Sequence, residues 1–215
     1  MASFIVSTLL AFLPLSVLAS PLPTDPVIQS PYFKLLSRPL DASLTNLTDL
    51  YLESYHIYPT FADAVLEPKT EEANARVGFL NGTQEEFEND NAVSPSSPSP
   101  CANFCVRKGK PRERKEKGGN GWLTCAGFPY GFVIDRSFNE SYIPAEINVG
   151  NGTQGIFIDQ GVIKVHDPLS GGFYACNKTL LYGTAIQLFY KIKYIATPAG
   201  CGDVELVVEY VDSSK

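Results

Sequence analysis

The feature that most constrains the fold is the stretch 171–210, in which apolar and polar side chains alternate with a period of two. This period places every second side chain on one side of an extended backbone, as in a half-buried β-strand. One run brings five side chains to a common face: Ile186, Leu188, Tyr190, Ile192 and Tyr194. The next run does the same with Val204, Leu206, Val208 and Tyr210. The stretch therefore predicts strands that define the fold.

Two cysteines, Cys176 and Cys201, lie near the expected beginnings of such strands, and one complete strand lies between them. We predict that they form a disulfide. Closing a loop of this size stabilises a domain by about 3.5 kcal/mol, if the bridge acts by lowering the entropy of the unfolded chain.

The first 19 residues have the composition of a signal peptide. They carry a long apolar run, no charged side chain, and a small residue at the end of Val17-Leu18-Ala19. The run is too short for a convincing membrane span, and no later apolar stretch reaches about 18 residues. We expect a signal peptide over 1–19, an extended lead-in over 20–31 and a single β domain over 32–215. The expected destination is the extracellular space or the cell wall.

Glycosylation motifs and cysteine usage favour the same compartment. Five Asn-x-Ser/Thr sequons predict N-glycosylation at Asn46, Asn81, Asn139, Asn151 and Asn177. Five cysteines suit an oxidising compartment but leave one thiol over after two bridges. Besides the C-terminal pair, Cys125 is expected to bond with Cys101 or Cys105.

Strand patterns recur between turn residues along the rest of the chain. The runs that read as strands are 32–36, 50–58, 75–83, 128–134, 156–158 and 162–165. The run 75–83 is expected to close in a turn at Asn81-Gly82, a dipeptide that accepts positive φ. With three C-terminal strands the total is about eight to ten, and no helical period is convincing. We predict an all-β fold, an antiparallel β-sandwich or barrel-like domain stapled by a disulfide.

Composition changes sharply between residues 85 and 119. An acidic run, the sequence SPSSPSP and the basic run 107–117 follow one another without apolar periodicity. We expect a long disordered insertion that does not carry the core. Its dibasic pairs at Arg107-Lys108 and Arg114-Lys115 are candidate processing sites, and its charge could contact anionic cell-wall polymers.

Three C-terminal segments carry a resemblance: residues 172–177 (GFYACN), 186–190 (IQLFY) and 201–206 (CGDVEL). Together with weaker similarity at 50–56 and 77–83, they resemble an uncharacterised domain found in secreted proteins of filamentous fungi. The resemblance implies a secreted β-rich domain with Cys176 and Cys201 as its cysteine pair. It implies no activity, so it supplies no catalytic residues.

The sequence offers no catalytic, cofactor-binding or metal-binding constellation. The two histidines, His56 and His166, lack a nucleophile-elbow or catalytic-cysteine context. Cys101 and Cys105, with three residues between them, have neither a second cysteine pair nor nearby histidines at ligand spacing, and secretion favours disulfides over a metal site. Four carboxylates are candidates for a glycosidase pair, although spacing in sequence cannot establish their separation: Asp135, Glu140, Glu146 and Asp159. Three aromatic residues around a Gly-rich region are candidates for a carbohydrate platform: Trp122, Tyr130 and Tyr142.

These observations favour a non-enzymatic protein at the cell surface or outside the cell, with extracellular glycans or a surface protein as partner. A lectin-like carbohydrate-binding protein and a secreted hydrolase are the alternatives. Secretion and a net charge of −6 argue against a nucleic-acid partner. Function is expected near the charged insertion and Trp122 rather than in the C-terminal strands.

Overall fold

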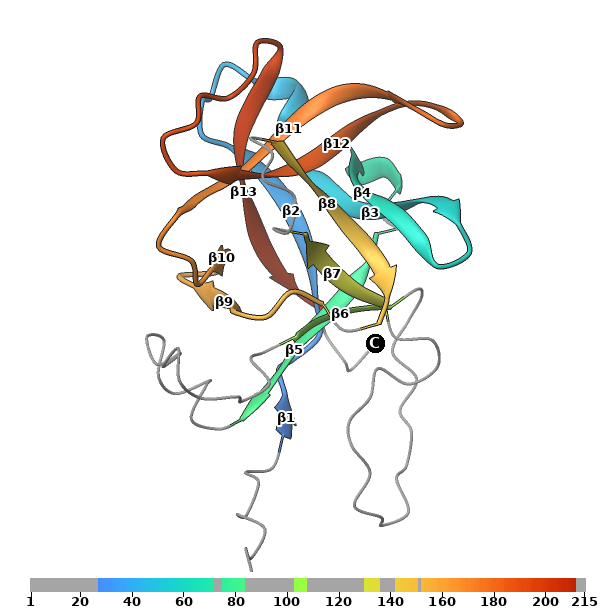
Figure 1. Cartoon of the computed structure of the whole chain (residues 1–215), viewed down its shortest axis with the longest axis vertical. Helices are drawn as coiled ribbons and strands as arrows, with labels where there is room; N and C mark the ends of the chain where they lie inside the picture. The colour runs from blue at the N-terminus through green and yellow to red at the C-terminus, as the bar shows by residue number, and fades with distance from the viewer. Residues whose placement is uncertain are drawn as a thin grey trace, which may run out of the picture.

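The structure is a computed structural model that describes residues 27–71, 75–83, 103–107, 130–135, 142–150 and 152–211. These residues form antiparallel strands and two short 3-10 helices, so the predicted all-β class is confirmed (Figure 1). The strands are β1 Val27–Gln29, β2 Phe33–Pro39, β3 Leu50–Tyr58, β4 Phe61–Pro68, β5 Val77–Thr83, β6 Asn103–Arg107, β7 Tyr130–Ile134, β8 Tyr142–Val149, β9 Ile156–Asp159, β10 Val162–Val165, β11 Ser170–Leu180, β12 Gly183–Ile192 and β13 Cys201–Tyr210. The 3-10 helices are η1 Thr45–Leu47 and η2 Lys69–Glu71. No helix of the described part is long and apolar enough to cross a membrane.

The strand pairings close on themselves, which makes the fold barrel-like. Strand β2 pairs with β13, β13 with β11, β11 with β12, β12 with β4, β4 with β3, and β3 again with β2. The closing contact joins Leu36 to Tyr51. A second series runs from β2 through β5, β6, β7 and β8 to β12 and β4. Closure satisfies backbone groups that an open sheet would leave unpaired.

The core lies on the face that the period-two pattern predicted. Leu188, Tyr190 and Leu206 are fully buried there, and Ile192 and Val208 pack against the same cluster. Burying a large apolar side chain contributes roughly 1.5–3 kcal/mol. The prediction is wrong at one end of the pattern, because Tyr194 lies beyond β12 with a φ of 72° and is 87% exposed. Tyr210 ends β13 and is 57% exposed, and its ring packs edge-on against the core residue Phe33.

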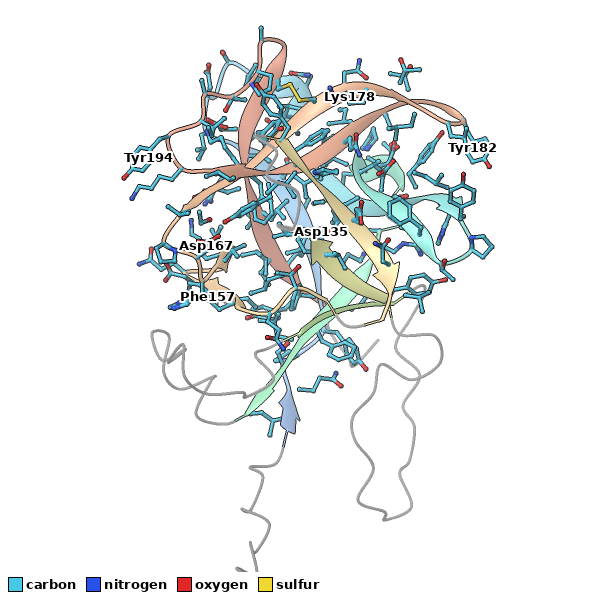
Figure 2. The ribbon with its side chains drawn as sticks, in the orientation of Figure 1. Asp135, Phe157, Asp167, Lys178, Tyr182 and Tyr194 are labelled. Carbon is cyan, nitrogen blue, oxygen red and sulfur yellow. A yellow bond between two sulfur atoms is a disulfide. The ribbon has the colours of Figure 1, made fainter. Side chains whose placement is uncertain are left out.

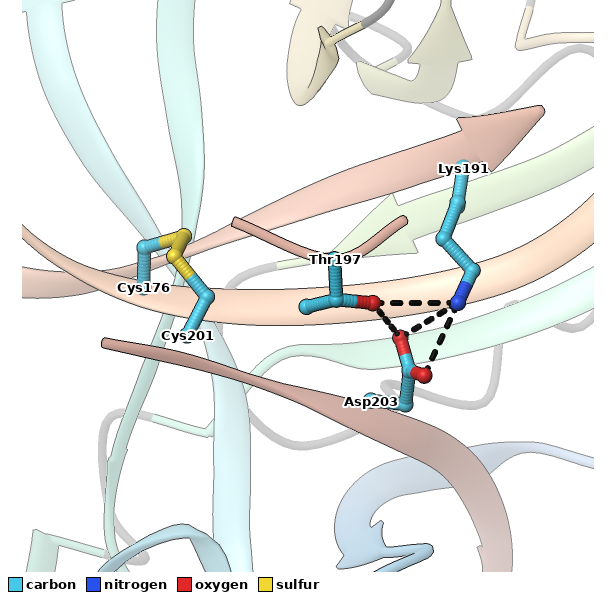
Figure 3. The surroundings of a disulfide bond; sticks show 5 residues. All are labelled: Cys176, Lys191, Thr197, Cys201 and Asp203. Atoms are coloured by element: carbon cyan, nitrogen blue, oxygen red, sulfur yellow. Dashed lines mark hydrogen bonds and ion pairs between the residues drawn. A yellow bond between two sulfur atoms is a disulfide. The ribbon is translucent and has the colours of Figure 1, made fainter. Parts of the chain in front are cut away.

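The predicted disulfide is present and joins residues that face each other across two strands (Figure 3). Cys176 lies in the middle of β11, rather than near its beginning, and Cys201 is the first residue of β13. Their Cα atoms are 4.4 Å apart, which lies within the usual range for a bridge. The disulfide therefore reinforces the pairing of β11 with β13, which is part of the closed series of strands.

The region between β5 and β7 differs from the sequence expectation. Asn81 and Gly82 form no turn, because both lie within β5, opposite Gln29 and Ile28 of β1. Residues 103–107, inside the expected insertion, form β6 between β5 and β7. The short run Asn-Phe-Cys-Val-Arg contains β-prone residues, and its backbone pairs with a strand on each side. It escapes prediction from the sequence because the polar and charged residues that flank it make the surrounding region look disordered. The other residues of 85–119 lie outside the described part.

Strand β4 is absent from the sequence prediction because it lacks a period of two. Its residues 62–66 are all buried, so apolar residues follow one another along it. The small side chains Ala62 and Ala64 further weaken the signal. The predicted strands at 156–158 and 162–165 are found as β9 and β10, which form an antiparallel hairpin around Gln160-Gly161.

Candidate functional site

Two carboxylates from neighbouring strands face each other on the outer side of the circuit. Asp63 of β4 and Glu146 of β8 are cross-strand partners. On β8 the alternate side chains Ile143, Ala145 and Ile147 enter the core, so Glu146 points away from it. Because like charges directly opposite each other destabilise a sheet, this pairing needs a local explanation.

Neutral amides hold both carboxylates. Gln187 Nε2 donates to Asp63 Oδ1 over 2.9 Å, and Asn148 Nδ2 donates to Glu146 Oε2 over 2.7 Å. Asp63 and Gln187 are both buried. The amide hydrogen bonds compensate part of the desolvation of each carboxyl group without supplying a counter-charge.

The pKa of each of the two carboxyl groups is raised. Burial raises the pKa of Asp63, against the opposing effect of the Gln187 hydrogen bond. Burial likewise raises the pKa of Glu146; the Asn148 hydrogen bond lowers it, and the charges of Asp63 and Asp135 raise it further. A raised carboxyl pKa is the direction of shift that a general acid requires.

The structure brings together only part of the carboxylate set proposed from the sequence. Asp135 follows β7 and acts on Glu146 through its charge, whereas Asp159 ends β9 in the hairpin with β10. Glu140 lies outside the described residues. Asp63 was missed, although a lone acid among the alanines of residues 61–66 was a usable signal.

A second polar cluster surrounds His56 at the end of β3. Ser54 Oγ lies 3.3 Å from His56 Nε2, and Arg76 Nη2 donates to the same Ser54 oxygen. The His56 ring packs edge-on against Tyr130, with ring centroids 6.1 Å apart. Burial lowers the pKa of Arg76, while the charges of Glu53 and Tyr130 raise it. A serine beside a histidine is the geometry of an activated nucleophile, but here the serine oxygen also accepts from a cation.

The second histidine lies between β10 and the turn at Pro168-Leu169. His166 follows β10, its backbone N–H donates to Gly155 O over 2.7 Å, and its ring packs edge-on against Phe157. The neighbouring Asp167 accepts hydrogen bonds from the Leu169 backbone N–H and the Tyr190 hydroxyl. These contacts shape the turn and place no nucleophile beside the ring.

An exposed tyrosine contacts a half-buried tyrosine at a place that the sequence prediction missed. Tyr182, in the turn between β11 and β12, is 72% exposed. Its ring lies 6.2 Å from that of Tyr55 on β3, and its backbone N–H donates to the Tyr55 hydroxyl over 2.6 Å. Of the predicted platform, Tyr130 packs on His56 as described, Tyr142 packs edge-on against Tyr174, and Trp122 lies outside the described residues.

A lysine fixes the connection that precedes the disulfide (Figure 3). Lys191 Nζ contacts both carboxylate oxygens of Asp203, at 2.7 and 2.8 Å, and the Thr197 hydroxyl at 3.0 Å. The Thr197 hydroxyl donates in turn to Asp203. The network ties the segment between β12 and β13 to β13, so its charges serve the fold.

The remaining predicted residues are placed as follows. Asn46 in η1 and Asn177 in β11 are exposed, and the backbone of Asn81 lies in β5. The residues outside the described part are Cys101, Cys125, Asn139 and Asn151, while Cys105 lies in β6. Within the described ranges, no group of three or more His, Cys, Asp or Glu side chains could hold a metal ion.

Comparison with known proteins gives one family. The model of a domain of unknown function, DUF7907, matches residues 30–103 and 103–210, which is most of the chain. No curated protein and no solved structure matches. The resemblance to an uncharacterised domain is thus confirmed at that level: this chain belongs to the DUF7907 family.

Proposed function

We propose that the mature chain is a secreted, N-glycosylated binding domain that acts at the cell surface or in the cell wall without catalysing a reaction. The observation that carries the proposal is the exposure of four tyrosines on turns and strand ends: Tyr58, Tyr142, Tyr182 and Tyr210. Tyr194 is exposed too, but the Lys193 ammonium group lies over its ring. Tyrosine supplies a large contact area at a low cost in side-chain entropy, which suits it to binding surfaces.

The exposed asparagines and the disulfide support the compartment. Asn46 and Asn177 are accessible to glycosyl transfer, and a bridged Cys176–Cys201 pair suits an oxidising environment. The resemblance to secreted proteins of filamentous fungi makes a fungal cell wall the first partner to test.

The test uses the full chain expressed in a eukaryotic secretory host. We expect glycoprotein in the medium that lacks residues 1–19, loses mass on deglycosylation and sediments with isolated fungal cell walls. Protein that has been reduced, alkylated and heated is the control, and it should stay in the supernatant. Retention inside the cell, or no sedimentation with walls or whole cells, would contradict the proposal.

Carbohydrate binding is a second candidate, favoured by the contact between Tyr55 and Tyr182. Two neighbouring rings on the surface offer an apolar face to the C–H groups of a sugar, while hydroxyl groups remain at the edges. A lectin-like protein should bind purified polysaccharides in the absence of any wall protein.

A secreted hydrolase is the third candidate, favoured by the facing carboxylates Asp63 and Glu146. A glycosidase needs two carboxylates across the scissile bond, one of them with a raised pKa. Turnover of glycosides in mildly acidic buffer, lost in both Asp63→Asn and Glu146→Gln but kept in the exposed-strand control Asp159→Asn, would establish it. An inactive wild-type protein on a broad panel of ester, peptide and glycoside substrates would dismiss it.

A further inference from the structure

We propose that Tyr55 and Tyr182, hereafter the tyrosine platform, bind the pyranose faces of a neutral cell-wall polysaccharide. The proposal rests on the carbohydrate-binding function proposed above and assigns it a site. Figure 2 shows Tyr182 projecting from one edge of the molecule, far from Tyr194 at the opposite edge.

The platform is held in place before any ligand binds. Tyr55 is part of the long β3–β4 ladder, opposite Asp63. The hairpin that carries Tyr182 is anchored because β12 pairs with β4 at Ile186 and Gln187. The hydrogen bond from the Tyr182 backbone N–H to the Tyr55 hydroxyl then links the two elements directly. Preorganisation lowers the entropy lost when a ligand binds.

The exposed aromatic surface of the platform is not covered by a lysine, unlike that of three other rings among the described residues. Lysine ammonium groups lie over the rings of Tyr51, Phe189 and Tyr194. Among the described lysines, none lies over Tyr55 or Tyr182, and the two rings are tilted by 35° rather than stacked face to face. A ligand can therefore contact Tyr182 without displacing a cation.

The charges next to the platform select against an acidic ligand. Asp63 lies directly opposite Tyr55, and Glu146 lies opposite Asp63 on the next strand. At neutral pH two carboxylates repel uronic acids, sulfates and phosphates, whereas a neutral sugar carries no charge for them to repel. The favoured ligands are glucan, chitin or mannan chains rather than pectin-like or phosphorylated polymers.

The size of the platform favours a sugar over a protein partner. One tyrosine buries roughly 150–250 Å² at most, so two rings fall well short of the ~800 Å² per partner of a stable protein interface. A pyranose ring has the dimensions of an aromatic ring and is covered by such a surface. Repeating residues along a polysaccharide compensate for a small contact through avidity.

The experiment measures depletion of the full-length glycoprotein from solution by insoluble β-1,3-glucan, chitin, cellulose and mannan. We expect wild-type protein to bind at least one of them. Tyr182→Ala should weaken binding at least about tenfold, and Tyr182→Phe should bind like the wild type because the ring remains. Tyr194→Ala is the matched control, since it removes an equally exposed tyrosine from the opposite edge and should change nothing.

A measurement on the unmodified chain guards against misfolding of the variants. Tetranitromethane should nitrate Tyr182 in free protein, and a soluble oligosaccharide of the bound polymer should protect Tyr182 while Tyr194 stays reactive. All Tyr182 variants retain the backbone N–H that binds Tyr55, so the same melting temperature is expected for each.

The outcomes separate this proposal from the broader ones. Binding that survives Tyr182→Ala, together with unprotected Tyr182, overturns the platform but leaves carbohydrate binding intact. Protein that sediments with cell walls yet binds none of the neutral polysaccharides overturns the platform and carbohydrate binding, and leaves a protein partner at the surface. Failure to bind either walls or polysaccharides overturns the binding function as well.

Discussion

At the scale of single residues, the carboxylates of the candidate site can be identified only from the residues that contact them in the fold. Asp63 and Glu146 are 83 positions apart in the sequence, and no sequence motif links residues at that separation. Their contact depends on which strands the chain places side by side. The titration of this pair and the packing of one glycine can be tested directly.

The carboxylate pair makes stability depend on pH. A carboxyl group with a pKa raised by folding binds protons more tightly in the native state, so its contribution is fully present below the unfolded pKa. This contribution is lost as pH rises through the raised native pKa, starting from the ordinary values of 3.8 for Asp63 and 4.5 for Glu146. We expect Glu146→Gln to stabilise the protein at neutral pH by about 0.2–1 kcal/mol, with no gain at pH 3.

Urea unfolding of the wild type and Glu146→Gln across this pH range measures the effect. The control is Glu205→Gln, because hydrogen bonding from Arg38 lowers the pKa of Glu205 and gives its loss the opposite sign. Equal stability of wild type and Glu146→Gln at every pH would refute the assignment.

Gly202 next to the disulfide leaves room for two leucines. A Cβ at this position would meet Leu44 Cδ1 and would lie 2.6 Å from Leu47 Cδ1, so η1 packs where a side chain would be. We expect Gly202→Ala to destabilise the protein by about 1–3 kcal/mol, measured by thermal unfolding. Adding Leu44→Ala should recover part of this lost stability in the double variant, because it removes one of the two clashing side chains. If the stability losses of the two single variants simply add in the double variant, the clash with Leu44 is not the cause.

At the scale of elements, the sequence predicted strands well where apolar or aromatic residues recur every second position. Strand β13 also alternates in burial, whereas β3 and β12 were found although three consecutive residues of β3 and four of β12 are buried. Strand β4 is buried on both faces, so alternation could not identify it. Strand β6 is short and flanked by polar sequence, and only its two partner strands explain it. The candidate site was predictable in one member, Glu146, because pairing across strands is not encoded locally.

Strand β6 allows a test of whether residues 103–107 are ordered, although the composition around them is typical of a disordered segment. Residues 103–107 are bonded on both sides, to β5 and β7, although their surroundings are low in apolar residues. Native-state hydrogen exchange should therefore show protected amides in a peptide spanning 103–107. The exposed amides of Asp41 and Ala42, which donate no hydrogen bond within the described part of the chain, serve as the fast-exchanging reference. Exchange at the reference rate would restore the expectation of a disordered segment.

The disulfide gives a second prediction at this scale. Replacing Cys176 and Cys201 together by alanine should lower the free energy of unfolding by about 2–4 kcal/mol. For a chain of this size each 1 kcal/mol corresponds to roughly 2–4 °C in melting temperature. Peptide mapping without reduction checks the premise, since alkylated Cys176 or Cys201 in native protein would remove it.

For the whole molecule, the decisive relation is that strands from both ends of the described chain pair with each other. Strand β13 lies along the full length of β2, from Val204 opposite Pro39 to Tyr210 opposite Phe33. The two segments matched by the family are also joined by the β12–β4 and β8–β4 pairings. These contacts favour a single cooperative unit, as the sequence length suggested.

We expect a single unfolding transition in urea, with coincident midpoints by far-ultraviolet circular dichroism and tyrosine fluorescence. Two resolved transitions would show that the segments 30–103 and 103–210 unfold as separate units. The oxidised wild-type protein is the appropriate sample, because reduction during the measurement would itself break cooperativity.

The closed circuit also determines how the protein behaves among its own copies. The series of paired strands ends at β1, with three residues, and at β9, with four. Unpaired edges are the templates on which β proteins polymerise, and short edges offer few hydrogen bonds to an incoming strand. In its described strands the fold thus carries built-in protection against strand-by-strand self-assembly. That property suits the cell-surface role proposed above, in which many copies of the protein would lie close together.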